Sequence, residues 1–356
     1  FWWTFARYLR FVSAGAPISA TWFNAILAGL LGGFAIFIKF SAAFFVIGGA
    51  LGLALSSFTL RDLLRKVQVW VLALIGALPA AAYLIYGIFI RGDLASQFNG
   101  RFVPALLLNP FNYLQWEVKA DMAAGGIFIM LGLLGLLLVK DRRLQVFLYG
   151  AWSAYILYGL FFDYHIATHD YYHLPFIPIV GLSLAPLGEW FFVHLTDAAP
   201  QGAVTARRWM RIAAYAVLVY GLFAVLWNVR NQMKAVDYRP EAAMWAEISE
   251  QFSSGASAIA LTQDYGSRLE YWGGRRFQTW PYLGDAGYAN LRGADASFDA
   301  FFDKHASKKD YFLVTDLDEF DRQSQLKERL FSSYPVYREG NGYLIFDLKP
   351  EDSNGS

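Results

Sequence analysis

The chain has no cysteine in its 356 residues, which excludes disulfides, thiolate metal ligands and a cysteine nucleophile. Charged residues are also scarce, at 17% against about 25% in soluble domains. Three short signatures are missing as well: a glycine-rich phosphate loop, a His-Glu-x-x-His pair and a Gly-x-Ser-x-Gly elbow. These absences argue against nucleotide hydrolysis.

Apolar residues are correspondingly frequent. The chain is 56% hydrophobic and 18% aromatic, with a mean hydropathy of +0.32. A helix needs about 20 mostly apolar residues to cross the hydrocarbon core, where its backbone must be satisfied internally. Buried helices of a soluble core would instead show amphipathic stripes and frequent charges. We therefore predict a polytopic α-helical membrane protein with seven transmembrane helices, at residues 21–38, 40–58, 67–90, 122–139, 144–162, 174–192 and 212–229.

Charge divides the chain into two parts. Residues 1–234 hold 17 basic and 9 acidic residues, a net +8, whereas the remainder holds 13 basic and 20 acidic, a net −7. A basic apolar part followed by an acidic part predicts a membrane body and an aqueous domain, and not a nucleic-acid-binding protein. We predict a transmembrane domain at 1–234, a soluble α/β domain at 235–350 and a disordered tail at 351–356.

The orientation follows from the basic residues, because short cytoplasmic loops carry an excess of Lys and Arg. Such residues gather in alternate connections, at positions 7 and 10, 61 to 66, 140 to 143 and 207 to 211. The opposite connections are then outside, and with them the C-terminal domain. In that domain, strands are expected at 256–261, 311–315 and 343–348, and helices from Pro240, at 298–305 and at 320–331.

Lys39 is the first candidate functional residue. It is the only charge between Arg10 and Arg61, and it lies where one predicted helix ends and the next begins at the outer surface. Its ammonium group is suited to neutralise a lipid phosphate. A lysine that only ends a helix by extending to the interface is the alternative.

The outer segment 163–175 is the densest in chemistry, with three His, two Asp and three Tyr. His165, His169 and His173 are four residues apart, a spacing that would align them on a helix face as metal ligands with Asp163 or Asp170. Interfacial anchoring by the tyrosines is a second interpretation. Polar contact with a head group or sugar is the one we favour, so no metal or other cofactor is predicted.

The outer loop 91–121 offers further charges. Its middle, at 102–111, is apolar but too short and too rich in proline to span, so we expect it along the membrane interface. Arg91 and Arg101 are candidates for phosphate contact, and Glu117 and Asp121 for proton acceptance. Charged residues at such positions are more often just a solvated flank.

Three stretches of the sequence carry a family resemblance. They are GFAIFIK at 33–39, HDYYHLPFIP at 169–178 and LEYWGGRR at 269–276. With the predicted topology, the chain resembles the C-type glycosyltransferase superfamily of membrane enzymes, which contains protein O-mannosyltransferases and bacterial aminoarabinose transferases. The first stretch is similar to the family's glycine, small residue, Ile-Lys stretch. The second is similar to its His-x-Tyr-Tyr-x-Leu-Pro motif, and the third to the Tyr-x-x-x-Arg segment of soluble tails.

The resemblance implies sugar transfer from a polyprenyl-phosphate donor to a lipid, glycan or protein acceptor, on the outer face of the bacterial inner membrane. It places Lys39, His169 and Tyr172 near the donor phosphate, where Arg91 and Arg101 would assist. Asp170 is a local catalytic candidate, together with His169. Acceptor contact is assigned to three residues of the soluble domain: Tyr271, Trp272 and Arg276.

In this family an acid on the first outer loop acts as the base. The chain opens at Phe1 without a methionine, so we expect the helices and loop that carry this acid to be missing from it. Two other functions stay open. A transporter or lipid flippase would place charges at mid-membrane, and a ligase or polymerase of lipid-linked polysaccharides is chemically close to the transferase.

Overall fold

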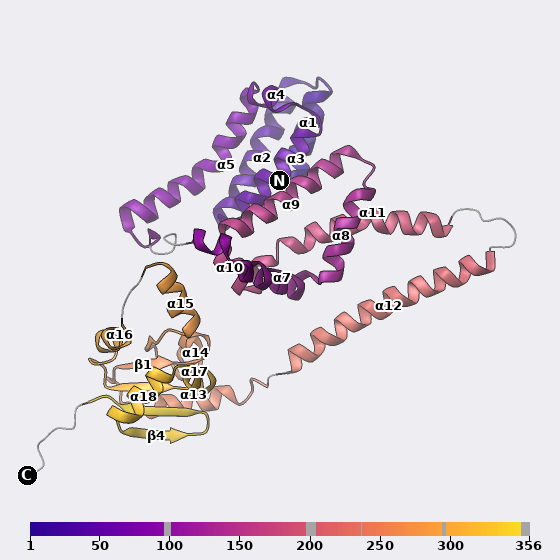
Figure 1. The fold of residues 1–356 in the computed structure, drawn as a ribbon. Helices are drawn as coiled ribbons and strands as arrows, with labels where there is room; N and C mark the ends of the chain where they lie inside the picture. Colours follow the sequence, from indigo (N-terminus) through magenta and orange to yellow (C-terminus); the bar gives the residue numbers. More distant parts are fainter. Residues whose placement is uncertain (96–100, 197–203, 236, 294–296, 350–356) are drawn as a thin grey trace, which may run out of the picture. The chain divides into compact units, whose positions relative to one another are not determined.

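The computed structural model describes the chain except for residues 96–100, 197–203, 236, 294–296 and 350–356 (Figure 1). The predicted tail at 351–356 lies outside the described residues. By its internal contacts the chain forms two compact units, Phe1–Ala213 and Ala214–Ser356. The division falls within helix α12 (Val204–Lys234), whereas the sequence placed it at the end of that helix.

The described part of the first unit is helical. Its elements are α1 (Trp2–Ser13), α2 (Ile18–Ile38), α3 (Ala42–Leu55), α4 (Leu60–Leu64), α5 (Val67–Ile85) with its π-helical extension η1 (Tyr86–Arg91), η2 (Pro104–Leu108), α7 (Pro110–Ala124), α8 (Gly126–Leu138), α9 (Arg142–Phe161), α10 (Asp163–Thr168), η3 (Asp170–His173) and α11 (Phe176–Thr196). The predicted loop 91–121 therefore contains a helix, α7, that the sequence did not suggest. Its start is capped by the side chain of Asn109, which accepts the N–H of Phe111.

Among the described residues, four helices are long and apolar enough to cross a membrane: Ile18–Ile38, Val67–Arg91, Arg142–Phe161 and Phe176–Val193. Helices α7 and α8 make a fifth candidate as a pair bent by 89°. Helix α3 is apolar but has only 14 residues, and the predicted span 212–229 lies in α12, outside these candidates. The structure thus supports four or five spans by length and composition, and the count of seven stays a prediction.

Glycines bring α3 and α9 into close contact. A Cβ atom added to Gly48 would stand 2.6 Å from the carbonyl oxygen of Gly150 and from the Cβ of Ala154. Gly52, one turn further along α3, lies equally close to the backbone of α9 at Val146. Small residues at this spacing let apolar helices approach closely. The contact fixes the start of α3, just after Lys39, beside the end of α9.

The second unit contains a five-stranded sheet in the order β2-β1-β3-β5-β4. Strand β1 runs parallel to β2 and β3, and β5 runs antiparallel to β3 and β4. The strands are β1 (Ala258–Leu261), β2 (Gln278–Thr279), β3 (Tyr311–Val314), β4 (Val336–Gly340) and β5 (Tyr343–Asp347). The other elements are α13 (Glu241–Glu250), η4 (Gln263–Gly266), α14 (Ser267–Gly273), α15 (Leu283–Leu291), α16 (Phe298–His305), α17 (Leu317–Arg322) and α18 (Ser324–Ser333).

Both faces of this sheet are covered by helices. Ile259 and Leu261 pack with buried residues of α16, α17 and α18, while the alternate residues Ala258 and Ala260 pack against α13 and α14. Burial on both faces explains why β1 is a continuous apolar run and not an alternating one. The predicted small α/β domain is confirmed, including β1, β3, β5 and α16.

Some elements of the second unit differ from the prediction. The helix expected at 320–331 is two helices, α17 and α18, with a break at Gln323. That side chain is buried and accepts a hydrogen bond from Trp280 Nε1. Strands β2 and β4 were not predicted, because one is two residues long and the other is largely exposed and polar.

Candidate functional site

Two cations of the first unit meet at one tyrosine. Lys39 follows α2 in an extended conformation, and its Nζ lies 5.7 Å from the centre of the Tyr172 ring. Arg101, 71 residues earlier than Tyr172, donates from Nη1 to the tyrosine hydroxyl over 3.2 Å. Tyr172 is buried, whereas Lys39 is exposed. We call Lys39, Arg101 and Tyr172 the cation cluster.

Two histidines adjoin this cluster. The ring centres of His165 and His169 lie 5.3 Å and 5.9 Å from that of Tyr172, and 5.7 Å from each other. Their spacing of four residues does bring them together, because α10 continues as far as Thr168. His169 is half-buried, and its Nδ1 is 2.7 Å from the hydroxyl of Thr168.

His173 has a different role. The indole N–H of Trp116 donates to the Tyr155 hydroxyl over 2.8 Å, and Tyr155 reaches His173 Nδ1 over 2.7 Å. On the other side of the ring, Nε2 is 2.8 Å from the carbonyl oxygen of Ile166. A carbonyl only accepts, so Nε2 carries the proton and Nδ1 accepts from Tyr155. Burial lowers the pKa of His173, which keeps this ring neutral.

The alignment of all three histidines on one helix face, which the spacing suggested, is not present in the described structure. Both ring nitrogens of His173 are engaged in hydrogen bonds, and the turn η3 takes the residue away from the face of His165 and His169. In the described part of the chain, no group of three His, Cys, Asp or Glu residues is arranged to hold a metal ion.

Asp163 holds the loop that carries Arg101. Its side chain is 1% exposed, and its carboxylate accepts the N–H of Val103 over 3.0 Å and that of Tyr164 over 2.7 Å. Burial raises the pKa of Asp163, and these two hydrogen bonds oppose the rise. Because Val103 is two residues from Arg101, Asp163 is a positioning residue for the cation cluster. The sequence alone suggests Asp163 only as a metal ligand.

Other predicted residues of the first unit lie apart from these contacts. Asp170 is exposed, and its carboxylate accepts the N–H of Tyr171. Arg91 forms an ion pair of 3.2 Å with Asp93, in which both side chains are more than half exposed. Asp121 accepts the N–H of Gly126 over 2.5 Å at the bend between α7 and α8, and so serves that bend. Glu117 is exposed on α7.

The predicted acceptor residues belong to the second unit. Tyr271 and Trp272 pack edge to face, 4.6 Å between ring centres, and are 76% and 45% exposed. Arg276 lies 3.8 Å from Glu270 and lines a cavity in which neither aromatic residue takes part. Of the three predicted acceptor residues, only Arg276 lines this cavity.

An apolar groove begins close to the cation cluster. It runs between α3 and α9, has a volume of about 480 Å³, and is floored by Gly48, Gly52 and Gly150. Its first lining residues on α3 are Ala43 and Phe44. Phe44 packs on Tyr158, whose ring stacks on that of Tyr172 at 6.0 Å. Sequence reasoning missed this groove, although the Gly-x-x-x-Gly pair in α3 is a signal for close helix packing.

The geometry of the first unit therefore suits an amphipathic anion, with its charge at the cation cluster and its apolar chain in the groove. No family model, curated protein or solved structure matches the chain. Any functional assignment thus depends on this geometry and on the motifs quoted from the sequence.

Proposed function

We propose that the protein is a glycosyltransferase that moves a sugar from a polyprenyl-phosphate donor to a lipid, glycan or protein acceptor. It would act at the outer face of the bacterial plasma membrane, with seven spans and an extracytoplasmic C-terminal domain. The observation that carries the proposal is the meeting of two cations at Tyr172 beside the start of an apolar groove.

The donor and the site match in charge and in shape. A polyprenyl phosphate joins an anion to a long apolar chain. In the described part of the chain, Lys39 forms no ion pair with a carboxylate, so its charge is available to a phosphate. The groove follows α3 from Ala43 to Leu55, about 18 Å at 1.5 Å per residue, which is long enough for several isoprene units.

In the proposed reaction, the bond between the anomeric carbon and the phosphate oxygen breaks, and its electron pair stays on the departing polyprenyl phosphate. The acceptor hydroxyl oxygen forms the new bond to the anomeric carbon and releases its proton to a base. Lys39 and Arg101 stabilise the charge of the leaving phosphate, a contribution that is often the largest in such reactions. His169, beside Tyr172, and Asp170 are the proposed proton acceptors in this chain.

The test is consumption of a radiolabelled polyprenyl-phosphate sugar by membranes that contain the full-length protein. Lys39→Ala and Arg101→Ala should each lower turnover by roughly 10²-fold, as loss of one charge-stabilising donor does in other enzymes. Lys39→Arg should retain part of the activity. Lys140→Ala, an exposed lysine on a predicted inside loop, is the matched control and should be unaffected.

The results separate the possible functions. If well-expressed parent protein consumes no lipid-linked donor, the transferase proposal fails. Movement of the intact lipid across the membrane would then favour a flippase, which needs the same amphipathic site without bond cleavage. If the donor is consumed equally by the parent and both alanine variants, the protein is a transferase but the cation cluster is not its phosphate site.

A further inference from the structure

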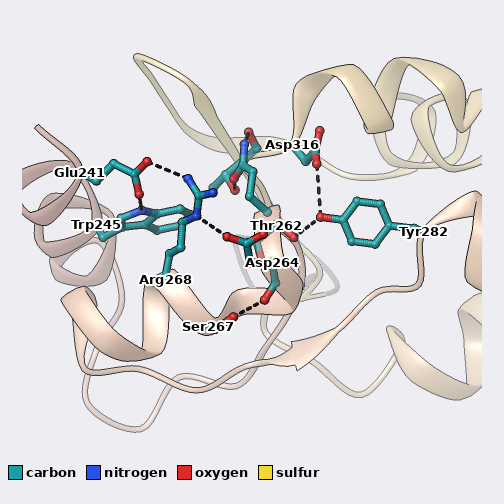
Figure 2. Close-up of polar contacts among 10 residues, drawn as sticks. Glu241, Trp245, Thr262, Asp264, Ser267, Arg268, Tyr282 and Asp316 are labelled. Carbon is teal, nitrogen blue, oxygen red and sulfur yellow. Dashed lines mark hydrogen bonds and ion pairs between the residues drawn. The ribbon is translucent and has the colours of Figure 1, made fainter. Parts of the chain in front are cut away.

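The loop after β1 in the second unit has an unusual backbone. Asp264, Tyr265 and Gly266 are consecutive and all left-handed, with φ of 51°, 55° and 80°. Side chains other than glycine rarely adopt this conformation, and such residues gather at functional sites. The loop is held by Arg268, whose Nε donates to Asp264 over 2.6 Å and whose Nη1 donates to Glu241 over 2.7 Å (Figure 2).

This loop borders a cavity of about 590 Å³ that lies at the carboxyl end of β1 and alongside β2. The volume is in the range of small-molecule sites, roughly 300 to 1,000 Å³. Ligands of open α/β sheets bind at this edge, outside the carboxyl ends of the parallel strands. The side chains of interest in its lining are Tyr265, Glu270, Arg276, Phe277 and Gln278.

The neighbouring crevice, between β1 and β3, is already filled. Tyr282 donates its hydroxyl to the carbonyl oxygen of Thr262 over 2.6 Å and lies 3.2 Å from the Asp316 carboxylate (Figure 2). Desolvation and the charge of Asp316 raise the pKa of Tyr282, so that the phenol stays a donor. Tyr282 also lines a second cavity, of about 520 Å³, on its α15 side, and it separates that cavity from the one beside the left-handed loop.

A buried hydroxyl next to the cavity has no partner of its own. Thr262 is 1% exposed, and its Oγ1 makes no hydrogen bond among the residues that the structure describes. A Cβ atom at Gly266, which lines the cavity, would stand 3.4 Å from this oxygen. Buried polar atoms are nearly always satisfied in folded proteins. Thr262 itself does not line the cavity, so Gly266 lies between this oxygen and the space for a ligand.

We propose that this cavity binds a saccharide. Glu270, Arg276 and Gln278 offer acceptors and donors for sugar hydroxyls, and the rings of Tyr265 and Phe277 offer apolar faces for the C–H groups of a pyranose. Glu270 and Arg276 lie 3.8 Å apart, and Arg268 neutralises the carboxylate at position 264. Arg268 also pairs with Glu241, so these three carboxylates and two guanidinium groups leave a net charge of −1, which disfavours an anion and allows an uncharged ligand rich in hydroxyls. The identification of this saccharide as the acceptor rests on the proposed function. Saccharide binding by the cavity does not depend on that function.

The test is saccharide binding by the full-length protein in a detergent without a sugar head group. Saturation-transfer NMR with glucose, galactose, N-acetylglucosamine and their common disaccharides gives both the binding and the ligand face in contact. At least one of these should bind saturably. Glu270→Gln and Gln278→Ala should weaken its affinity at least tenfold, while Glu328→Gln, an exposed acid on α18, should leave it unchanged.

Tyr265→Gly protects the test against misfolding, because it removes the ring and also relieves a left-handed backbone. It should lose binding while the protein stays folded, because relief of the backbone offsets the loss of the hydrogen bond to Asp285 and of the ring contact with Tyr282. The inference is overturned if no saccharide binds to the folded wild type, or if the cavity variants bind as well as wild type does. A protein that consumes the lipid donor but binds no saccharide would refute the cavity assignment alone. Saccharide binding without donor consumption would refute only the transferase.

Discussion

Substitution of His173 should lower the stability of the protein, because this side chain is fully buried and makes two hydrogen bonds. In His173→Leu, the carbonyl of Ile166 loses its donor and the hydroxyl of Tyr155 loses its acceptor. Leaving a buried polar group unpaired costs about 1 to 3 kcal/mol. We therefore expect this variant to lose about 2 to 5 kcal/mol of stability.

The same residue predicts how stability depends on pH. Burial lowers the pKa of His173 in the folded state, so the unfolded chain binds a proton below its ordinary pKa of about 6.5 while the folded chain does not. The contribution to stability is thus fully present above about pH 6.5. It is lost as the pH falls below that value, at up to about 1.4 kcal/mol per pH unit.

Thermal unfolding of the full-length protein in detergent, at pH values between 5 and 8, measures both effects. The matched control is His169→Leu, four residues earlier, where the ring is half-buried and contacts Thr168. The control should keep the melting temperature of the wild type and its fall at acid pH. His173→Leu should have a lower melting temperature, and that temperature should depend less on pH. Equal melting temperatures of wild type and His173→Leu at pH 7.5 would refute the hydrogen-bond assignment.

Three further substitutions test other parts of the structure. Gly52→Val would force a side chain into the backbone of α9 and should cost about 1 to 3 kcal/mol in thermal unfolding, whereas Gly188→Ala, which meets open space, should cost little. Gly266→Ala should cost about 1 to 2 kcal/mol, because alanine is strained at a φ of 80°; chemical denaturation measures it. Asp163→Ala leaves the N–H of Val103 without its acceptor, so limited trypsinolysis followed by mass spectrometry should show faster cleavage after the nearby arginine. Unchanged cleavage would contradict the positioning role.

Neighbours in sequence were the easiest part of the site to predict. His169 and Tyr172 belong to one short segment, so their proximity follows from local geometry. The sequence did not show which of Arg91 and Arg101 lies beside Tyr172, because both are basic residues of one loop. It depends on the hydrogen bonds of Val103 to Asp163, 60 residues away. Long-range pairing of this kind leaves no local pattern.

The fold shows the same limit. Hydropathy located the apolar helices and the buried strands, because each is a continuous apolar run. It did not reveal that α8 is bent by 89° from α7 at Gly125, where φ is 78°. Nor did it reveal the groove between α3 and α9, which exists only once the two helices are paired. The loop after β1 was also missed: Asp264 is of a type that sometimes adopts a left-handed backbone, but Tyr265, which follows it, is not.

If α3 crosses the bilayer, as the sequence predicts, its shortness has a consequence for the lipids around it. Its 14 residues extend about 21 Å, against a hydrocarbon core of about 30 Å. A helix that is too short is accommodated by local thinning of the bilayer or by sinking of its flanking residues. Lys39, at the start of α3, would then lie below the level of the surrounding head groups, and a thinner bilayer would bring those head groups to it. Membrane thickness would thereby set how readily Lys39 meets a lipid phosphate, with shorter acyl chains favouring the encounter.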